Sequence, residues 1–292
     1  MAVVERRLLG MVESVFAVAN ALGGFRTVRG VLLDGTIDAE TLRAAVRRVS
    51  EVLPLLRARI ERSWRGTEFV VGDRLDVLPL EIHDRFGDEH WQWAAESELH
   101  RPREASDPLW RLLYLRPASG QGPSELVLTM HHAICDGTAG PSLVHLLLTA
   151  CAELTEGRPA LAGMQQPLSI AADRLLTDRS QALRVWRFSE TLLRSAMPSR
   201  RPRLFRTCDE TPVKSTSRRT EIEFDQWDED LSAEFVARCR EERTSVHGAL
   251  CAGMLAASRP LMEAGDRAYS CYSNVNLRPF CVPPVDPRQF GC

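Results

Sequence analysis

The stretch from residue 125 to residue 140 combines an apolar run with side chains that could do chemistry. It reads ELVLTMHHAICDGTAG. The apolar run predicts a buried strand, and the Asp-Gly pair after it predicts a turn that leads into a helix. His131 and His132 stand at the strand end, and Asp136 and Gly137 stand in the turn. A sheet holds the side chains at its strand ends in place, so this is a favourable position for a catalytic or binding group.

The residue types in this stretch suit acid–base chemistry. A histidine can act as a general base because the pKa of a free imidazole, about 6.5, lies near neutral pH. Asp136 follows His132 by four positions, and it could orient either histidine or pair with a distant arginine. Gly137 allows a close backbone approach, and the N–H groups at a helix start favour developing negative charge.

Spacing alone leaves other interpretations to weigh. A metal site is disfavoured because adjacent strand residues point to opposite faces of a sheet. The chain also has no HExxH, and its other five histidines form no ligand-spaced cluster. No GxSxG is present, which argues against a serine hydrolase. A purely structural pair of core histidines stays open at this point.

The elements that must position this stretch follow from the hydrophobic pattern. Mixed strands and helices are predicted over most of the chain, which makes it an α/β (α+β) protein. Asp38 is the predicted N-cap of a helix that Pro54 ends. The expected strands are 25–33, 55–60, 68–71, 78–82, 109–115, 125–130, 219–224 and 268–276. The expected helices are 90–101, 140–154, 181–194, 228–241 and 246–257.

Composition narrows the function classes further. The 292 residues carry a formal net charge of −2, which argues against a general nucleic-acid binder. No apolar run reaches the roughly 18–20 residues of a membrane-spanning helix. The N-terminus shows no signal peptide, and none of the eight cysteines forms a CxxC pair. We therefore expect a cytoplasmic protein with reduced thiols, without a membrane span and without a bound metal.

The stretch has a specific resemblance. Residues 131–137, HHAICDG, match the HHxxxDG motif of the chloramphenicol-acetyltransferase-like superfamily, which includes condensation domains of nonribosomal peptide synthetases and stand-alone acyltransferases. The chain most resembles acyltransferases of the phthiocerol/phthiodiolone dimycocerosyl transferase type, and alcohol acetyltransferases. Five further segments resemble the family in its own order: LGMVESVF (9–16), LPLLRA (53–58), PLSI (167–170), SVHGALCAGML (245–255) and NLRP (276–279). Gly10 replaces the serine that is usual in the first of them, and Leu53 replaces a usual histidine in the second.

The resemblance implies a role for each motif residue. His132 would be the general base that takes a proton from the acceptor, and His131 would mainly pack. Asp136 would brace the loop by pairing with Arg278. Gly137 would leave room for substrate and offer its N–H to the oxyanion.

The resemblance also implies the reaction and the partners. The donor would be an acyl-CoA or an acyl group on the phosphopantetheine arm of an acyl-carrier protein, and the acceptor a small alcohol or amine. No cofactor would be bound permanently. The product would belong to natural-product or lipid biosynthesis. Two alternatives stay open: a catalytically inactive homologue or fragment that binds a carrier protein, and a condensation domain of a nonribosomal peptide synthetase.

The family pattern predicts two lobes, each a mixed sheet with helices. We expect an N-terminal lobe with the motif at 1–165, a connecting helix and linker at 166–217, and the start of a C-terminal lobe at 218–292. The family's second lobe is longer and carries a DFG-type motif that is absent here, so we expect this lobe to be incomplete and the activity of the 292-residue form to be uncertain. The arginines of the linker could meet CoA phosphates or an acidic carrier, or simply be solvated. These arginines are Arg200, Arg201, Arg203, Arg206, Arg218 and Arg219, and the same stretch contains Lys214.

Overall fold

The chain forms two compact units in its computed structural model, which describes residues 3–23, 26–101, 107–175, 219–259, 276–286 and 289–291. The first unit comprises Met1–Thr177, Lys214–Ile222 and Asn276–Cys292. The second comprises Asp178–Val213 and Glu223–Val275. The segment that carries Arg278 therefore folds with the unit that carries the two motif histidines. The lobe boundaries at 165 and 217 stay predictions.

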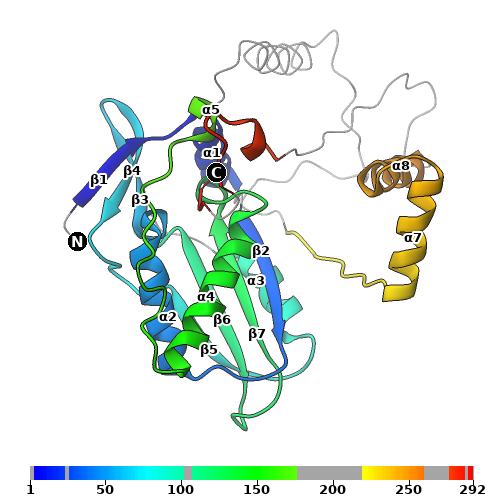
Figure 1. The fold of residues 1–292 in the computed structure, drawn as a ribbon, viewed down its shortest axis with the longest axis horizontal. Helices are drawn as coiled ribbons and strands as arrows, with labels where there is room; N and C mark the ends of the chain where they lie inside the picture. Colours follow the sequence, from blue (N-terminus) through cyan, green and yellow to red (C-terminus); the bar gives the residue numbers. More distant parts are fainter. Residues whose placement is uncertain are drawn as a thin grey trace. The chain divides into compact units, whose positions relative to one another are not determined.

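A four-stranded sheet forms the centre of the first unit (Figure 1). Its strand order is β2 (Arg26–Leu33), β7 (Ser124–His131), β6 (Trp110–Pro117) and β5 (Leu80–Arg85). The β5–β6 pair is parallel and the other two pairs are antiparallel. Strand β7 therefore has a hydrogen-bonded neighbour on each side, which fixes the backbone up to the histidine at its end.

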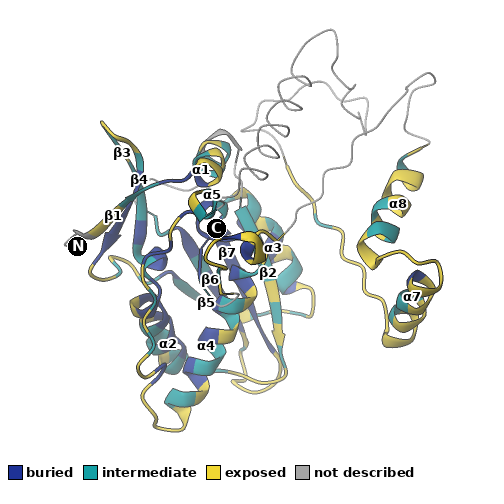
Figure 2. Cartoon of the chain, turned by 45° about the horizontal axis from the view of Figure 1, so that its top comes forward, coloured by how far each residue is buried: buried dark blue, intermediate teal, exposed yellow. Residues whose placement is uncertain are grey.

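Helices cover both faces of this sheet. Helices α2 (Ala39–Val52) and α4 (Ala139–Thr155) pack on one face, where the larger core includes Leu112 and Tyr114 of β6. Helix α3 (His90–His100) packs on the other face, against Leu113 and Leu115. Successive strand residues point to opposite faces, so a strand covered on both sides is apolar throughout. All eight residues of β7 are buried. Figure 2 colours the chain by how far each residue is buried.

The start of α2 follows its sequence signals. The Asp38 carboxylate accepts a hydrogen bond of 2.9 Å from the Thr41 N–H and caps the helix, as predicted. The predicted apolar face is fully buried; its members are Leu42, Ala45, Val46, Val49 and Leu53. The helix ends at Val52, and Pro54 begins a 3-10 turn, η1 (Pro54–Arg57). The predicted strand at 55–60 is therefore wrong in its first half, because Pro54 sets a turn conformation and the Leu56 N–H bonds to Leu53 O.

A second, three-stranded sheet has the order β1–β4–β3. Its strands are β1 (Val3–Leu8), β4 (Gly66–Gly72) and β3 (Ala58–Ser63), all antiparallel. Helix α1 (Met11–Gly23) follows β1 and leads to β2, and a short helix, α5 (Ala172–Leu175), follows α4 in the chain. Helix α1 packs against the 3-10 turn η2 (His132–Ile134), which is the turn of the histidine motif.

The predicted strand at 219–224 is wrong. Residues 219–228 have no regular structure, and side chains of α3 satisfy the backbone groups that a neighbouring strand would pair with. The Thr220 N–H donates to His100 Nε2 at 3.0 Å, and the Ile222 N–H donates to the Glu96 carboxylate at 2.8 Å. A β-type composition cannot distinguish a strand from an extended segment that binds side chains.

In the second unit the structure describes two helices. Helix α7 (Glu229–Glu241) is capped by Asp228, which accepts from the Leu231 N–H at 2.7 Å. Helix α8 (Val246–Ser258) is capped by Ser245, which accepts from the Gly248 N–H at 3.0 Å. The predicted helix at 181–194, the arginine-rich linker up to residue 218 and all but the last residue of the predicted strand at 268–276 lie outside the described residues. No helix in the described part of the chain is both long and apolar enough to cross a membrane.

Candidate active site

The histidine motif occupies the junction between β7 and α4. Strand β7 ends at His131, whose N–H bonds to Leu109 O at 2.7 Å beside β6. Its partner in β2 is Arg26. Turn η2 follows at once and α4 begins at Ala139. The sheet thus fixes the backbone on one side of the motif, and helix α4 fixes it on the other.

His131 is bound to the backbone of its own turn. Its Nδ1 accepts a hydrogen bond of 3.0 Å from the Ala133 N–H, and the residue is buried. An imidazole nitrogen that accepts from an N–H carries no hydrogen, so the neutral ring has its proton on Nε2. This arrangement stabilises the start of η2 and leaves Nδ1 of His131 occupied.

His132 has the opposite tautomer. Its Nδ1 lies 3.0 Å from the carbonyl oxygen of Cys135. A carbonyl oxygen can only accept, so Nδ1 carries the hydrogen and Nε2 of the neutral ring has a lone pair. The residue is half-buried, and its ring stacks on Phe16 of α1 with 4.0 Å between ring centroids and 19° between planes. One backbone acceptor and one aromatic face therefore define the orientation of this imidazole.

Both oxygens of the Asp136 carboxylate are occupied. Oδ1 accepts from the Thr138 N–H at 3.0 Å, the Thr138 hydroxyl at 2.9 Å and the Ala139 N–H at 2.8 Å. Oδ2 accepts from Arg278 Nε at 2.7 Å. Burial by itself would raise the pKa of this carboxyl, but the bonds from Arg278, Ala139 and Thr138 outweigh burial and hold the pKa below its ordinary value. Asp136 joins the first turn of α4 to Arg278.

Arg278 is buried among carbonyl oxygens. Its Nη1 donates to Asp286 O at 3.1 Å and to Gln289 O at 2.6 Å, and its Nη2 donates to Gly291 O at 3.1 Å. With Nε on Asp136, the guanidinium ties the segment around residues 276–291 to the motif loop. An arginine suits this position because its planar fork presents several donors in fixed directions.

Gly137 is exposed at the turn. A methyl group added there would meet no atom within 4 Å. Packing among the described residues therefore does not require glycine at this position. Its carbonyl oxygen accepts from Arg29 Nη2 at 3.1 Å, which fastens the turn to β2.

The cysteine within the motif is not a nucleophile. Cys135 is buried, and burial raises the pKa of its thiol to about 11. Its sulfur contacts the Thr27 hydroxyl at 3.2 Å, which keeps it in the interior. At neutral pH this side chain is a thiol and acts as a small apolar group. Among the residues that the structure describes, no group of three or more His, Cys, Asp or Glu side chains is placed to hold a metal ion.

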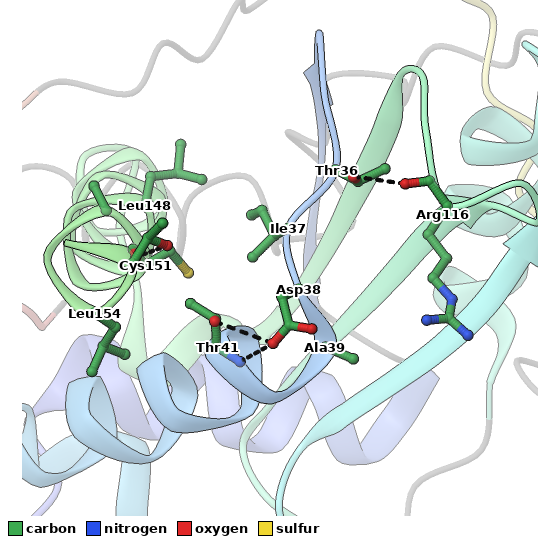
Figure 3. A pocket seen from close by; sticks show the side chains of 12 residues that line it. Thr36, Ile37, Asp38, Ala39, Thr41, Arg116, Leu148, Cys151 and Leu154 are labelled. Carbon is green, nitrogen blue, oxygen red and sulfur yellow. Dashed lines mark hydrogen bonds between the residues drawn. The ribbon is translucent and has the colours of Figure 1, made fainter. Parts of the chain in front are cut away.

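Two hollows lie beside α4. The larger, of about 950 Å³, is formed by the loop between β2 and α2, the start of α2, the end of β6 with the loop after it, and the second half of α4 (Figure 3). Its polar group Asp38 is committed to capping α2, with its carboxylate on Thr41. Neither the motif histidines nor Asp136 line it. The smaller, of about 610 Å³, runs between β2 and α4, and Arg29 is its link to the motif turn.

Comparison with known proteins finds relatives of this chain. Residues 216–291 match the family model described as phthiocerol/phthiodiolone dimycocerosyl transferase C-terminus. The transferase of that name from Mycobacterium tuberculosis (strain H37Rv) is 25% identical over 288 residues, which cover 97% of this chain and 65% of that protein. The similarity to this acyltransferase thus extends over nearly the whole of this chain. This chain spans 65% of the length of this mycobacterial relative, which is just under two thirds.

Solved condensation-like structures establish the fold of this chain. The first condensation domain of the calcium-dependent antibiotic synthetase superposes with a TM-score of 0.50 at 18% identity, over 66% of this chain and 49% of that one. The X-domain solved with OxyB from teicoplanin biosynthesis superposes with a TM-score of 0.51 at 17% identity, over 64% of this chain and 44% of that one. The chain has the chloramphenicol-acetyltransferase-like fold, with a mixed α/β architecture.

The structure brings together residues that the sequence placed far apart, and it adds others. His131, His132, Asp136, Gly137 and Arg278 lie in one unit. Sequence reasoning did not link Phe16 to His132. The segment 9–16 gave a signal, because it resembles a family motif that ends in phenylalanine, but the motif does not show which residue that ring contacts.

Proposed function

We propose that this chain transfers an acyl group from a thioester to a hydroxyl or amine, with His132 as general base. The observation that carries the proposal is the hydrogen bond between His132 Nδ1 and Cys135 O. It fixes the tautomer in which Nε2 accepts a proton. A general base needs this lone pair within reach of the acceptor group.

The reaction balances with this chain's residues alone. His132 Nε2 takes the proton of the acceptor hydroxyl or amine as that atom attacks the thioester carbonyl carbon. The tetrahedral intermediate expels the thiolate, and the imidazolium returns the proton to its sulfur. The products are an ester or amide and a free thiol. No covalent acyl-enzyme is needed, in keeping with the raised pKa of the Cys135 thiol.

The other motif residues have supporting roles in this proposal. Asp136 and Arg278 hold the loop that carries His132, through the bonds described above. The Gly137 N–H is the candidate donor to the oxyanion, at an exposed position that a substrate can approach. His131 supports the turn through the Ala133 N–H.

The named relatives support the substrate classes. The mycobacterial relative is a dimycocerosyl transferase, and a protein of similar fold is a condensation domain. We propose an acyl-CoA or a carrier-bound acyl group as donor, a small alcohol or amine as acceptor, and the cytoplasm as the location. Neither donor is a permanently bound cofactor; each is consumed as substrate.

A thiol-release assay on the full chain tests the proposal. The protein is mixed with acetyl-, octanoyl- or palmitoyl-CoA and with 1-octanol or octylamine, and free CoA is measured with a thiol reagent. We expect release that depends on the acceptor and falls at least about 100-fold in His132→Ala. The matched control is His83→Ala, an exposed histidine on β5, which should keep full activity.

The outcomes separate the alternatives. Equal release by the wild type and His132→Ala contradicts the proposal. Binding of a carrier protein without release above the variant's level favours an inactive binding homologue. Release with octylamine but not with 1-octanol favours the amide-forming chemistry of a condensation domain.

A further inference from the structure

Helix α1 is fixed at its start by a buried ion pair. The Glu13 side chain is 1% exposed and receives two hydrogen bonds of 2.8 Å from the Arg7 guanidinium, one on each carboxylate oxygen. The Gly10 N–H donates to the same carboxylate at 2.6 Å. A bidentate pair of this kind sets both the position and the direction of the groups it joins. The first turn of α1 is thereby tied to β1.

A second set of bonds ties the same turn to α5. The Met11 N–H donates to Asp173 Oδ2 at 3.1 Å. The Ser14 hydroxyl donates to Gly10 O at 2.7 Å, within the turn. The start of α1 is therefore held on two sides, by β1 and by α5, and its later residues extend from a fixed base.

Phe16 lies one helical turn after Glu13. Residues three apart on a helix lie on neighbouring parts of its surface, so the Phe16 ring lies next to the turn that Glu13 anchors. The centroid distance of 4.0 Å and the angle of 19° show a face-to-face contact with the His132 imidazole. The hydrogen bond to Cys135 O fixes one atom of that imidazole, and the stack fixes its plane. Together the two contacts set the direction of the Nε2 lone pair.

We propose that Phe16 is a positioning residue for His132, and that the Arg7–Glu13 pair holds the helix that presents it. The inference rests on the proposed function, in which His132 is the base.

The test combines kinetics with a signal from the imidazole itself. Phe16→Met replaces the flat ring by a flexible apolar side chain, and Phe16→Tyr keeps the ring. In full-length protein labelled with ¹⁵N-histidine, the His132 resonances are assigned by their loss in His132→Ala. We expect Phe16→Met to shift the ring protons of His132 downfield as the aromatic ring current is lost. We expect kcat to fall about 10- to 100-fold with KM within about two-fold, because misplacing a catalytic group acts mainly on the chemical step. Phe16→Tyr should restore both.

Two further variants sharpen the result. Glu13→Gln should shift the His132 resonances in the same direction as Phe16→Met but less, since it loosens the helix and leaves the ring. Val18→Ala, at an exposed position on α1, is the matched control and should change neither measurement.

The failures of the two proposals can be told apart. If Phe16→Met leaves the His132 resonances and kcat unchanged in a protein that folds, Phe16 does not position His132. The same holds if Phe16→Tyr fails to rescue. If the resonances shift as expected while His132→Ala keeps full activity, the positioning stands and the general-base function is wrong.

Discussion

Arg278 Nε and Asp136 Oδ2 lie 2.7 Å apart, across 142 positions of sequence. The Arg278 side chain is 8% exposed and that of Asp136 is 29% exposed, so solvent screens this pair only in part. Three of the other four N–H donors of Arg278 bond to backbone carbonyls. The pair therefore links the motif loop to a folded segment near the end of the chain.

Breaking this pair should destabilise the protein strongly. In Arg278→Met the Asp136 carboxylate keeps its burial and loses its counter-ion, so we expect the free energy of unfolding to fall by about 3–5 kcal/mol. Urea unfolding followed by circular dichroism measures this. The control is Arg43→Met, which removes an exposed pair with Glu40 and should change the free energy by less than about 1 kcal/mol. Equal losses in the two variants would show that the buried pair contributes no more to the free energy of unfolding than the exposed pair.

The same carboxylate predicts the acid dependence of stability. The folded protein holds the pKa of Asp136 below its ordinary value. As the pH falls, Asp136 therefore takes up a proton at a higher pH in the unfolded chain than in the folded protein. The free energy of unfolding consequently decreases as the pH falls below about 4. Above about pH 5 this contribution is fully present. Unfolding of the wild type and Asp136→Asn is compared from pH 7 to pH 3. The wild-type advantage should be constant down to about pH 5 and shrink below about pH 4; an advantage that stays constant to pH 3 would refute the assignment.

The two adjacent histidines should respond differently to substitution. His131→Ala leaves the buried Ala133 N–H without its acceptor, so the free energy of unfolding should fall by about 1–3 kcal/mol. His131→Asn offers an oxygen acceptor and should recover part of this loss. His132→Ala should instead lower kcat in the thiol-release assay, with a smaller loss of stability. A kcat loss in His131→Ala as large as in His132→Ala, in a protein of unchanged stability, would reverse the two roles.

Glycine at position 10 should be required in this chain. A methyl group there would lie 2.1 Å from Asp173 Oδ1 and 2.5 Å from the Ala171 methyl. We expect Gly10→Ala to lower the free energy of unfolding by about 1–3 kcal/mol, because overpacked sites force their neighbours to move. Gly35→Ala is the control, since its methyl group would meet nothing within 4 Å. Thermal melts that show the same midpoint for both variants would count against the close packing.

Local signals in the sequence predicted much of this fold. The cap at Asp38 depends on residues within one turn, and the structure has it; the structure also has the helices predicted at 228–241 and 246–257. The strand predicted at 219–224 failed because its backbone groups bind α3 side chains, which a local pattern cannot show.

For the site residues, the sequence predicted some features and not others. The motif named His132, but its tautomer depends on the carbonyl of Cys135, which only the three-dimensional turn brings to Nδ1. The pairing of Asp136 with Arg278 was expected from the resemblance and from no spacing rule. The stack of Phe16 on His132 had no counterpart in the prediction, because it arises where α1 packs on η2.

The first unit is built from separate segments of the chain, and this affects how it can fold during synthesis. All strands of its four-stranded sheet and both motif histidines come before Thr177 in the sequence, yet Asn276–Cys292 belongs to the same unit. During synthesis the Asp136 carboxylate emerges from the ribosome long before Arg278 does. The nascent chain can build the sheet early, but the loop that carries His132 gains its final support only after the segment with Arg278 has been synthesised and has joined it.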